Sequence, residues 1–381
     1  MIDIFREDCF GCTACASVCP NNAISFERDK LGFFYPTIDH DKCIECNLCE
    51  KICPVKACGS VLNPEPKNVY AARHISLEEV KSSRSGAAFI AFSDVILGKD
   101  GSVYGAAFDE GLEVKHIKTV CSEERNRLKG SKYVQSDLRG IIDEIKRDLR
   151  NEQFVLFSGT PCQVAGVKAV IPQNNSDRLY LLDILCHGVP SPFLWRDYIR
   201  YQENNHGGRM TKFDFRDKSI NGWSDHIESM VFDGKHQLVD KLYTNLFYSN
   251  SFFRDCCYKC PFATTSRVGD ITLVDFWGWE KVSKDLNSDN CGISLLLVNT
   301  SKGEALFEES KYSLNTLPVD IADCMQRNLK QPTPEPEIRV EYVNYYKKNG
   351  FEKLVKYIYN PSLIQRVVRK IKRQIINGKK N

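Results

Sequence analysis

The sequence is CFGCTACASVCP at residues 9–20 and CIECNLCEKICP at residues 43–54, and these two runs decide the fold of the first part of the chain. In each run three cysteines are separated by two residues, and a fourth follows after three more residues and precedes a proline. Each cysteine of the first run has a counterpart 34 residues later, which indicates an internal duplication. Short strands at 23–26 and 34–38, joined by a turn, are expected between the runs.

This spacing is typical of a ferredoxin module that holds two [4Fe–4S] clusters. The three closely spaced thiolates hold one cluster, whereas the cysteine before the proline ligates the other. The first cluster is expected to use Cys9, Cys12, Cys15 and Cys53. The second is expected to use Cys43, Cys46, Cys49 and Cys19. Zinc is the alternative, because paired Cys-x-x-Cys motifs also bind zinc, but a zinc site does not need eight thiolates in this doubled order.

Cysteine usage also bears on the compartment. Nine of the seventeen cysteines precede residue 60, in tight clusters, whereas a secreted disulfide protein would be shorter and would spread them along the chain. No apolar run is long enough for a membrane span, and the N-terminus lacks a signal-peptide pattern. A cytoplasmic protein with redox cofactors is therefore expected.

Charge is unevenly distributed along the chain. The formal net charge is +3, but residues 361–381 carry seven Lys or Arg and no Asp or Glu, so that the rest of the chain is at −4. This balance does not indicate nucleic acid as a partner. The tail has apolar residues on one helical face, which suits an anionic membrane or an acidic partner. A solvated terminal helix is the favoured interpretation, because chain ends are commonly loosely ordered.

Beyond the linker at 63–66, strands and helices alternate. A strand at 154–157, a helix at 162–170 and a strand at 179–185 predict a parallel β-α-β unit, with Thr160 as the N-cap and Pro161 at the first helical position. The fold class is an α+β ferredoxin-like N-terminal domain followed by an α/β mixed-sheet domain with a C-terminal helical extension. The expected boundaries are 1–62, 68–330 (in two parts, 68–150 and 151–330) and 331–381.

Four further cysteines occupy strand ends or loops of the expected α/β domain: Cys162, Cys186, Cys257 and Cys260. Strand ends at one edge of such a sheet converge in space, so these thiols could hold a third cluster. The alternative is that Cys162 and Cys186 are buried core thiols, which are common. Cys256 could also take the place of Cys257.

Several strings together resemble one known family. They are SGTPCQ at 158–163, DILCHGVPSP at 183–192, FRDK at 215–218, CYKC at 257–260 and GDITLVDFWG at 269–278. From about residue 65 to 330 the chain resembles the coenzyme F420 hydrogenase/dehydrogenase beta-subunit family, with the ferredoxin module fused in front. The resemblance implies FAD, and it implies a third [4Fe–4S] cluster on the four cysteines named above.

The function implied is that of an iron–sulfur flavoprotein oxidoreductase. Electrons would pass from a ferredoxin-type donor or another redox partner protein through the clusters to FAD, and on to a small organic acceptor, deazaflavin-like or other. The alternative is an electron-relay subunit that is docked to a catalytic partner and has no substrate of its own. The sequence leaves open the acceptor, the direction of electron flow, the choice between FAD and FMN, and whether the chain forms a homo-oligomer.

No Gly-x-Gly-x-x-Gly fingerprint follows a strand, so the flavin pyrophosphate must be held elsewhere. The loop with Ser83, Ser85 and Gly86 precedes a helix, whose N-terminus attracts anions. It resembles the Ser/Gly loop of the family, although Ala87 stands where a second glycine is usual. The other candidate flavin residues are Lys132, Tyr133, Gln135, Ser136, Gly159, Thr160 and Trp277. Their alternatives are a polar surface turn for 129–136 and a core role for the tryptophan.

Two residues are candidates for proton delivery to a reduced acceptor. His187 follows Cys186 directly, and Asp275 lies at the end of an expected strand. His187 could equally support the neighbouring ligand cysteine.

Overall fold

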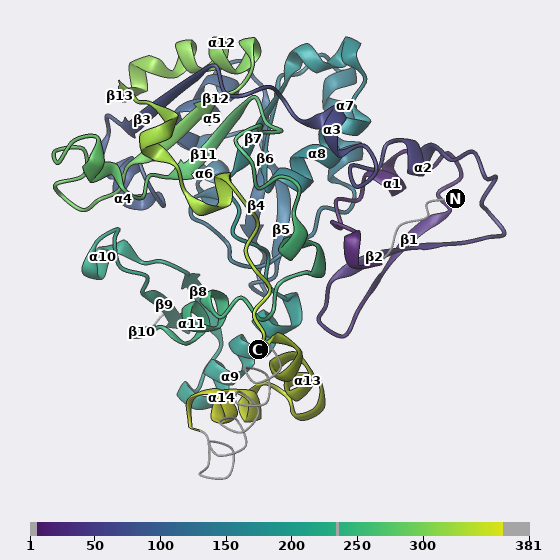
Figure 1. Cartoon of the computed structure of the whole chain (residues 1–381), viewed down its shortest axis with the longest axis vertical. Helices are drawn as coiled ribbons and strands as arrows, with labels where there is room; N and C mark the ends of the chain where they lie inside the picture. Colours follow the sequence, from purple (N-terminus) through teal and green to yellow (C-terminus); the bar gives the residue numbers. More distant parts are fainter. Residues whose placement is uncertain (1–5, 234–235, 361–381) are drawn as a thin grey trace, which may run out of the picture.

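The computed structural model describes residues 6–233 and 236–360 (Figure 1). The basic tail predicted at 361–381 lies outside these described residues. The centre of the molecule is a mixed sheet of eight strands. In spatial order these are β13 (Leu314–Pro318), β3 (Asn68–His74), β12 (Ser294–Val298), β11 (Ile271–Asp275), β7 (Leu179–Ile184), β6 (Val155–Gly159), β4 (Ser102–Phe108) and β5 (Val114–Thr119).

The middle of the sheet is parallel. Strands β11, β7, β6 and β4 run in the same direction, with Leu156 of β6 opposite Val103 of β4 and Tyr180 of β7. The β6–β7 pair has the parallel arrangement that the β-α-β pattern predicts. The outer neighbours β5, β12, β3 and β13 pair antiparallel. Strands β3 and β13 are not among the strands expected from the sequence.

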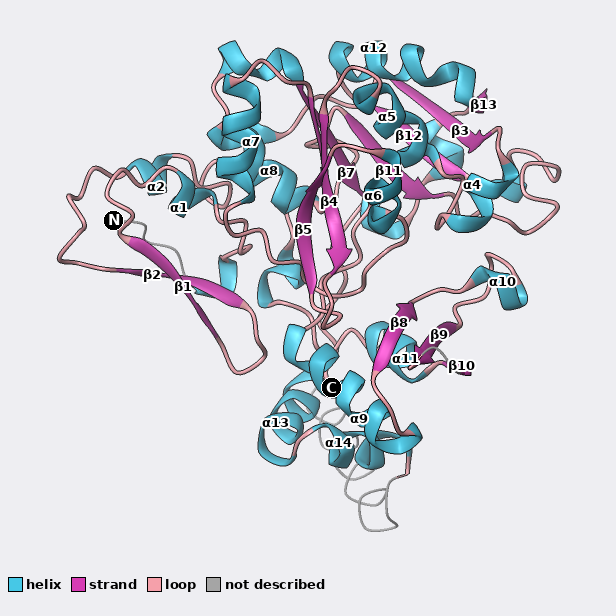
Figure 2. Ribbon diagram, turned by 180° about the vertical axis from the view of Figure 1, so that it is seen from behind, coloured by secondary structure: helices cyan, strands magenta, loops and turns pink. Residues whose placement is uncertain are grey.

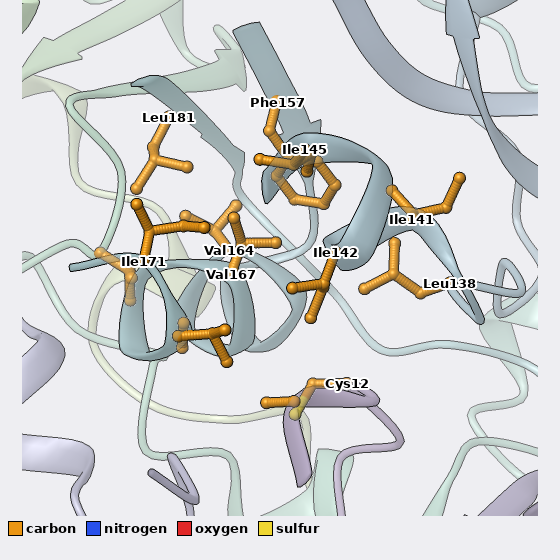
Figure 3. Packing of buried hydrophobic residues seen from close by; sticks show 14 of the residues in the cluster. Cys12, Leu138, Ile141, Ile142, Ile145, Phe157, Val164, Val167, Ile171 and Leu181 are labelled. Carbon is orange, nitrogen blue, oxygen red and sulfur yellow. The ribbon is translucent and has the colours of Figure 1, made fainter. Parts of the chain in front are cut away.

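Helices cover both faces of the sheet (Figures 1 and 2). Helices α5 (Ala88–Leu97) and α12 (Ser301–Ser310) contribute to one apolar cluster with β3, β4 and β12. Helices α7 (Ile141–Arg150) and α8 (Pro161–Val170) pack against β6 and β7 in another cluster. Figure 3 shows this second cluster, in which Val164 and Val167 of α8 lie near Phe157 and Leu181 of the sheet. The short helices α4 (Leu77–Ser82) and α6 (Ser122–Arg125) flank the first face.

The ferredoxin module contains the antiparallel pair β1 (Ile24–Arg28) and β2 (Phe34–Ile38). Its short helices are α1 (Ala14–Ser17), α2 (Leu48–Lys51) and α3 (Cys58–Val61). The duplication extends to the backbone. Gly11 and Glu45 are both left-handed, with φ of 70° and 53°, and so are Thr13 and Asn47, with φ of 63° and 58°. Each of these pairs is 34 residues apart, as the cysteines are.

A third body lies below the large sheet in Figure 1. It consists of the sheet β8 (Met210–Asp214), β9 (Glu228–Phe232) and β10 (His236–Asp240) and of helices α9 (Pro192–His206), α10 (Lys218–Asn221), α11 (Leu242–Tyr248), α13 (Arg339–Asn349) and α14 (Phe351–Tyr359). Leu354 of α14 and Trp195 of α9 belong to one buried cluster, which also contains Phe33 of the ferredoxin module. The described part of the C-terminal extension therefore shares its core with earlier segments. Within the described ranges, every helix is too short or too polar to cross a bilayer.

Candidate functional site

The eight cysteines of the ferredoxin module line two separate small cavities, in the crossed arrangement that the spacing predicts. The first cavity is lined by Cys9, Cys12, Cys15 and Cys53. The second is lined by Cys43, Cys46, Cys49 and Cys19. The cysteine before each proline thus lines the cavity of the other run, and in each run a left-handed residue, Thr13 or Asn47, precedes a short helix.

The cysteines around the first cavity are more buried than those around the second. Burial, reinforced by the neighbouring thiols of Cys9 and Cys53, raises the pKa of Cys15 to about 12. Burial likewise raises the pKa of Cys12 well above its usual value. Four thiols around one space, three of them on buried residues, are costly to ionise without a compensating positive charge. A bound iron cluster supplies that charge, so the donor set fits a [4Fe–4S] group.

The third cysteine group comes together from three segments. Cys162 lies in the first turn of α8, Cys186 follows β7, and Cys257 and Cys260 lie within and just after the 3₁₀ helix Asp255–Lys259. Burial raises the pKa of Cys186, and the thiols of the other three raise it further. Burial and the thiols of Cys162 and Cys257 raise the pKa of Cys260 to about 12. The four half-buried residues therefore bring their thiols together in one group, the third thiol cluster, which fits a cubane as the ferredoxin groups do.

Cys256 and Cys257 have different surroundings. Cys256 is 5% exposed and belongs to the apolar cluster of α7 and α8. A hydrogen bond from the Cys256 thiol lowers the pKa of Cys257, which also accepts the Val189 N–H at 3.5 Å. These contacts favour Cys257 as the ligand.

Across the described ranges, no three His, Cys, Asp or Glu side chains approach closely enough to hold a single metal ion.

A cavity of about 410 Å³ opens at the carboxyl ends of the parallel strands, where α/β folds commonly bind ligands. Cys186 lies on its wall. The same wall carries almost every residue that was expected from the sequence to contact flavin or substrate: Ser83, Ser85, Lys132, Tyr133, Gln135, Ser136, Gly159, Thr160, His187, Asp275 and Trp277. Gly86 is absent from the wall, although Ser85 and Ala87 on either side of it are present.

Cationic side chains gather on this wall. The side chain of Arg84 is 10% exposed, and its nearest carboxylate is that of Asp214, at 3.9 Å from Nη1. Among the described residues, its Nε and Nη2 have no hydrogen-bond partner. Burial lowers the pKa of Lys132 to about 7. Lys132 already donates to the carbonyls of Arg127 and Lys129. Arg84, a largely buried cation with two unused donors beside the cavity, fits an anionic ligand such as a pyrophosphate.

His116 of β5 also faces the cavity, and the sequence analysis missed it. The ring is 4% exposed and stacks on Phe157 at 5.2 Å between centroids. Nε2 lies 3.0 Å from the carbonyl of Ser158 and must therefore donate, which leaves Nδ1 as an acceptor. Within the described chain Nδ1 has no partner. Nothing in a lone histidine of an alternating strand indicates this role, because the contact depends on the pairing of distant strands.

Two residues of the loop before α5, Ser85 and Gly86, have structural roles. The Ser85 hydroxyl donates to the carbonyl of Ile293 at 2.5 Å. Gly86 allows close approach of two strands, since a Cβ there would lie 2.3 Å from the carbonyl oxygen of Ala72. Ala87 has φ of 61°, so the position where the family usually has glycine is left-handed in this chain too. In contrast, the buried Ser83 hydroxyl lacks a partner among the described residues and is free for a ligand.

The segment 129–136 is more than a surface turn. Tyr133 stacks on Phe247 at 4.3 Å, and Ser136 accepts a hydrogen bond from Gln163 at 2.8 Å. Gln163 also accepts from the backbone N–H of Thr160, the predicted N-cap of α8. Trp277 stacks on Trp223 at 4.1 Å, so it is held by an aromatic neighbour while it lines the cavity.

Both candidates for proton delivery lie on the wall, and both have partners. The carboxylate of Asp275 accepts from Nη1 of Arg216 at 2.5 Å in an ion pair. His187 lies with Nε2 2.8 Å from the side-chain oxygen of Asn250 and with Nδ1 3.3 Å from that of Asn328. These contacts suit His187 to a supporting role beside Cys186 as well as to proton transfer.

The fold and the cysteine groups define an iron–sulfur electron-transfer protein. Residues 8–57 match the model of the 4Fe-4S dicluster domain. Residues 153–320 match the family model that describes the C terminus of the coenzyme F420 hydrogenase/dehydrogenase beta subunit. The resemblance to that beta-subunit family, with a ferredoxin domain in front, is thereby confirmed.

A comparison with solved structures finds similarity to a chain of the xenon-derivatised F420-reducing [NiFe] hydrogenase complex from Methanosarcina barkeri. The identity is 16%, the TM-score is 0.48, and the match covers 79% of this chain and 93% of that one. No curated protein matches the sequence.

Proposed function

We propose that this protein is an iron–sulfur flavoprotein oxidoreductase with three [4Fe–4S] clusters and one FAD. The observation that carries the proposal is the shared cavity, whose wall contains both Cys186 of the third thiol cluster and Arg84, a cation with unused donors of the kind expected for a flavin pyrophosphate. Electron transfer between a cluster and a flavin requires that the two groups lie close together. A cluster ligand on the wall of the flavin pocket provides this.

The chain's own residues would divide the work of holding FAD. Ser83 and Arg84, with free donors, and Lys132 would bind the pyrophosphate, and binding of this anion would keep the Lys132 ammonium charged. Gly159 and Thr160 lie beside Cys162 and would face the redox-active ring, together with the unpaired acceptor of His116. Bound FAD supplies the means to collect electrons singly and release them in pairs.

Asp275 and His187 have defined tasks in this proposal. Asp275 pairs with Arg216, so this carboxylate orients the Arg216 guanidinium at the cavity wall. His187, fixed by Asn250 and Asn328, is the wall residue that can supply a proton to an acceptor that has taken up two electrons.

The proposal is tested by anaerobic rapid mixing of the holoprotein with a reduced ferredoxin. In the wild-type protein the clusters and then the flavin absorption should be reduced. In Cys186→Ser the flavin step should slow at least roughly tenfold, because a thiolate ligand of the third cluster is lost. The matched control is Cys324→Ser, a buried cysteine that does not line the cavity. Equal flavin reduction in Cys186→Ser and wild type would overturn the proposed route.

An electron-relay subunit is the second candidate. The description of the matched family model as a beta subunit favours it. Under this alternative the reduced protein would not be reoxidised by any free deazaflavin, nicotinamide or other small acceptor, but only by a partner protein. Steady turnover with a free acceptor would exclude it.

A further inference from the structure

Arg254 occupies the junction between the ferredoxin module and the third thiol cluster. It is 1% exposed. Its Nε donates to the carbonyl of Cys9 at 2.6 Å, and its Nη2 donates to the carbonyl of Phe34 at 2.8 Å. Its Nη1 donates to the side-chain oxygen of Gln135 at 3.0 Å, and Gln135 donates in turn to the carbonyl of Phe10. The guanidinium thus binds the loop that carries the first cysteine run.

The backbone of Arg254 is fixed to the third cluster instead. Its N–H donates to the carbonyl of Val189, three residues after Cys186, and its carbonyl accepts from the N–H of Cys257 at 2.9 Å. The guanidinium lies 4.1 Å from the centre of the Tyr35 ring. One residue therefore connects two groups of predicted cluster ligands, the first through its side chain and the second through its backbone.

The charge of Arg254 needs an explanation. All three of its side-chain hydrogen bonds end on neutral oxygen atoms, and an arginine buried so completely is normally paired with an anion. The nearby groups able to carry negative charge are the thiols of Cys9, Cys256 and Cys257 and the phenol of Tyr35, and they raise the pKa of Arg254 against the effect of burial. Thiolate-bound clusters on either side would be the missing counter-charge.

The sequence makes room for this arginine at one cluster only. A Cβ on Gly11 would lie 3.0 Å from Nη1 of Arg254 and 3.2 Å from Nε2 of Gln135. The equivalent position of the second run is Glu45, which has the same left-handed backbone. The duplication is therefore broken where Arg254 enters, and the second cluster lacks this contact.

We propose that Arg254 is a positioning residue for electron transfer. Its buried positive charge raises the reduction potentials of two inner clusters, which are the first ferredoxin cluster and the third cluster. Their potentials thereby lie above that of the outer cluster at Cys43–Cys49. One electron leaves the outer cluster, which is oxidised, and enters the first ferredoxin cluster, which is reduced, while no bond changes and no proton moves. A low-potential one-electron donor supplies it. Each reduction adds negative charge beside Arg254, and this charge is attracted at low dielectric. The part that concerns the third cluster rests on the proposed function.

The test is a redox titration of the anaerobic holoprotein, followed by electron paramagnetic resonance. Arg254→Gln should lower the midpoint potentials of the two inner clusters and leave the outer one unchanged. Arg254→Lys keeps the positive charge, so the midpoint potentials of the two inner clusters should stay close to their wild-type values. Gln135→Glu, which places a negative charge on the same guanidinium without removing it, should lower the potentials as Arg254→Gln does.

Arg125→Gln is the control, because Arg125 is 3% exposed and its side chain pairs with Asp94, which is not among the predicted cluster ligands. It should change none of the potentials. If Arg254→Gln fails to retain its clusters, Gln135→Glu decides the outcome. The proposal is overturned if Gln135→Glu, or a fully loaded Arg254→Gln, leaves the inner potentials at the wild-type values, or shifts all clusters equally. If the wild-type protein contained only eight irons, the proposed function with three clusters would be wrong. The effect of Arg254 on the potential of the first ferredoxin cluster could still be measured.

Discussion

Gly166 of α8 and Cys12 of the first cysteine run are in direct contact: a Cβ added at Gly166 would lie 2.7 Å from Cβ of Cys12 and 3.0 Å from its Sγ. Cys12 thus belongs to the apolar cluster of α7 and α8, as Figure 3 shows. The same helix carries Cys162 in its first turn. One rigid element therefore holds a ligand of the third thiol cluster and supports a ligand of the first.

Gly166→Ala should loosen this junction. Overpacking at a closely packed position costs about 1–3 kcal/mol, so the variant should melt at a lower temperature and lose part of its iron on gel filtration. Gly59→Ala is the control, because a Cβ at Gly59 meets no atom within 4 Å. Indistinguishable melting temperatures and iron contents for the two variants would contradict the importance of the contact.

Cys257→Ser should remove about four irons per chain, because it deletes one of four ligands of the proposed third cluster. Cys256→Ser should keep its iron, since Cys256 lies in the apolar cluster beside the site. Iron analysis of both variants purified without oxygen checks this. The reverse pattern would assign Cys256 as the ligand.

The cysteine spacing alone predicted the ferredoxin module with its crossed grouping, because three ligands of each cluster are close in sequence and the fourth is marked by the proline that follows it. The sequence could not decide between Cys256 and Cys257, since burial depends on how α7 and α8 pack. It also could not identify Arg254 or His116. Their partners, the Cys9 and Ser158 carbonyls, are 245 and 42 residues away. Strand β3 likewise takes its place only through pairing with β12 and β13, which follow it by more than 200 residues.

Arg84→Gln should weaken FAD binding. A charge-assisted hydrogen bond is worth about 1.5–3 kcal/mol, which corresponds to a loss of affinity of roughly tenfold to a hundredfold. The measurement is fluorescence titration of deflavinated protein with FAD. Arg125→Gln, which removes a buried arginine that does not line the cavity, should bind FAD as the wild type does. Unchanged affinity in Arg84→Gln would remove this residue from the site.

His116 should make the protein less stable as the pH falls. Burial lowers the pKa of His116 to about 4 from 6.5, so between these values the unfolded chain binds the proton more readily than the folded one. Stability is therefore complete above pH 6.5 and decreases toward pH 4, by up to about 3 kcal/mol.

Thermal melting of the holoprotein at pH 7.5 and pH 5 checks this expectation. The melting temperature of His116→Gln should fall less than that of the wild type. His40→Gln, at an exposed position of the ferredoxin module, should behave as the wild type does. An equal fall in all three proteins would show that His116 does not contribute to the pH dependence.

The measurement that tests the central claim most directly is the iron and flavin content per chain of protein purified without oxygen. The three thiol clusters and the cation-lined cavity predict about twelve irons, four for each cubane, and one FAD. About eight irons with no flavin would contradict the three-cluster flavoprotein and leave a two-cluster electron relay.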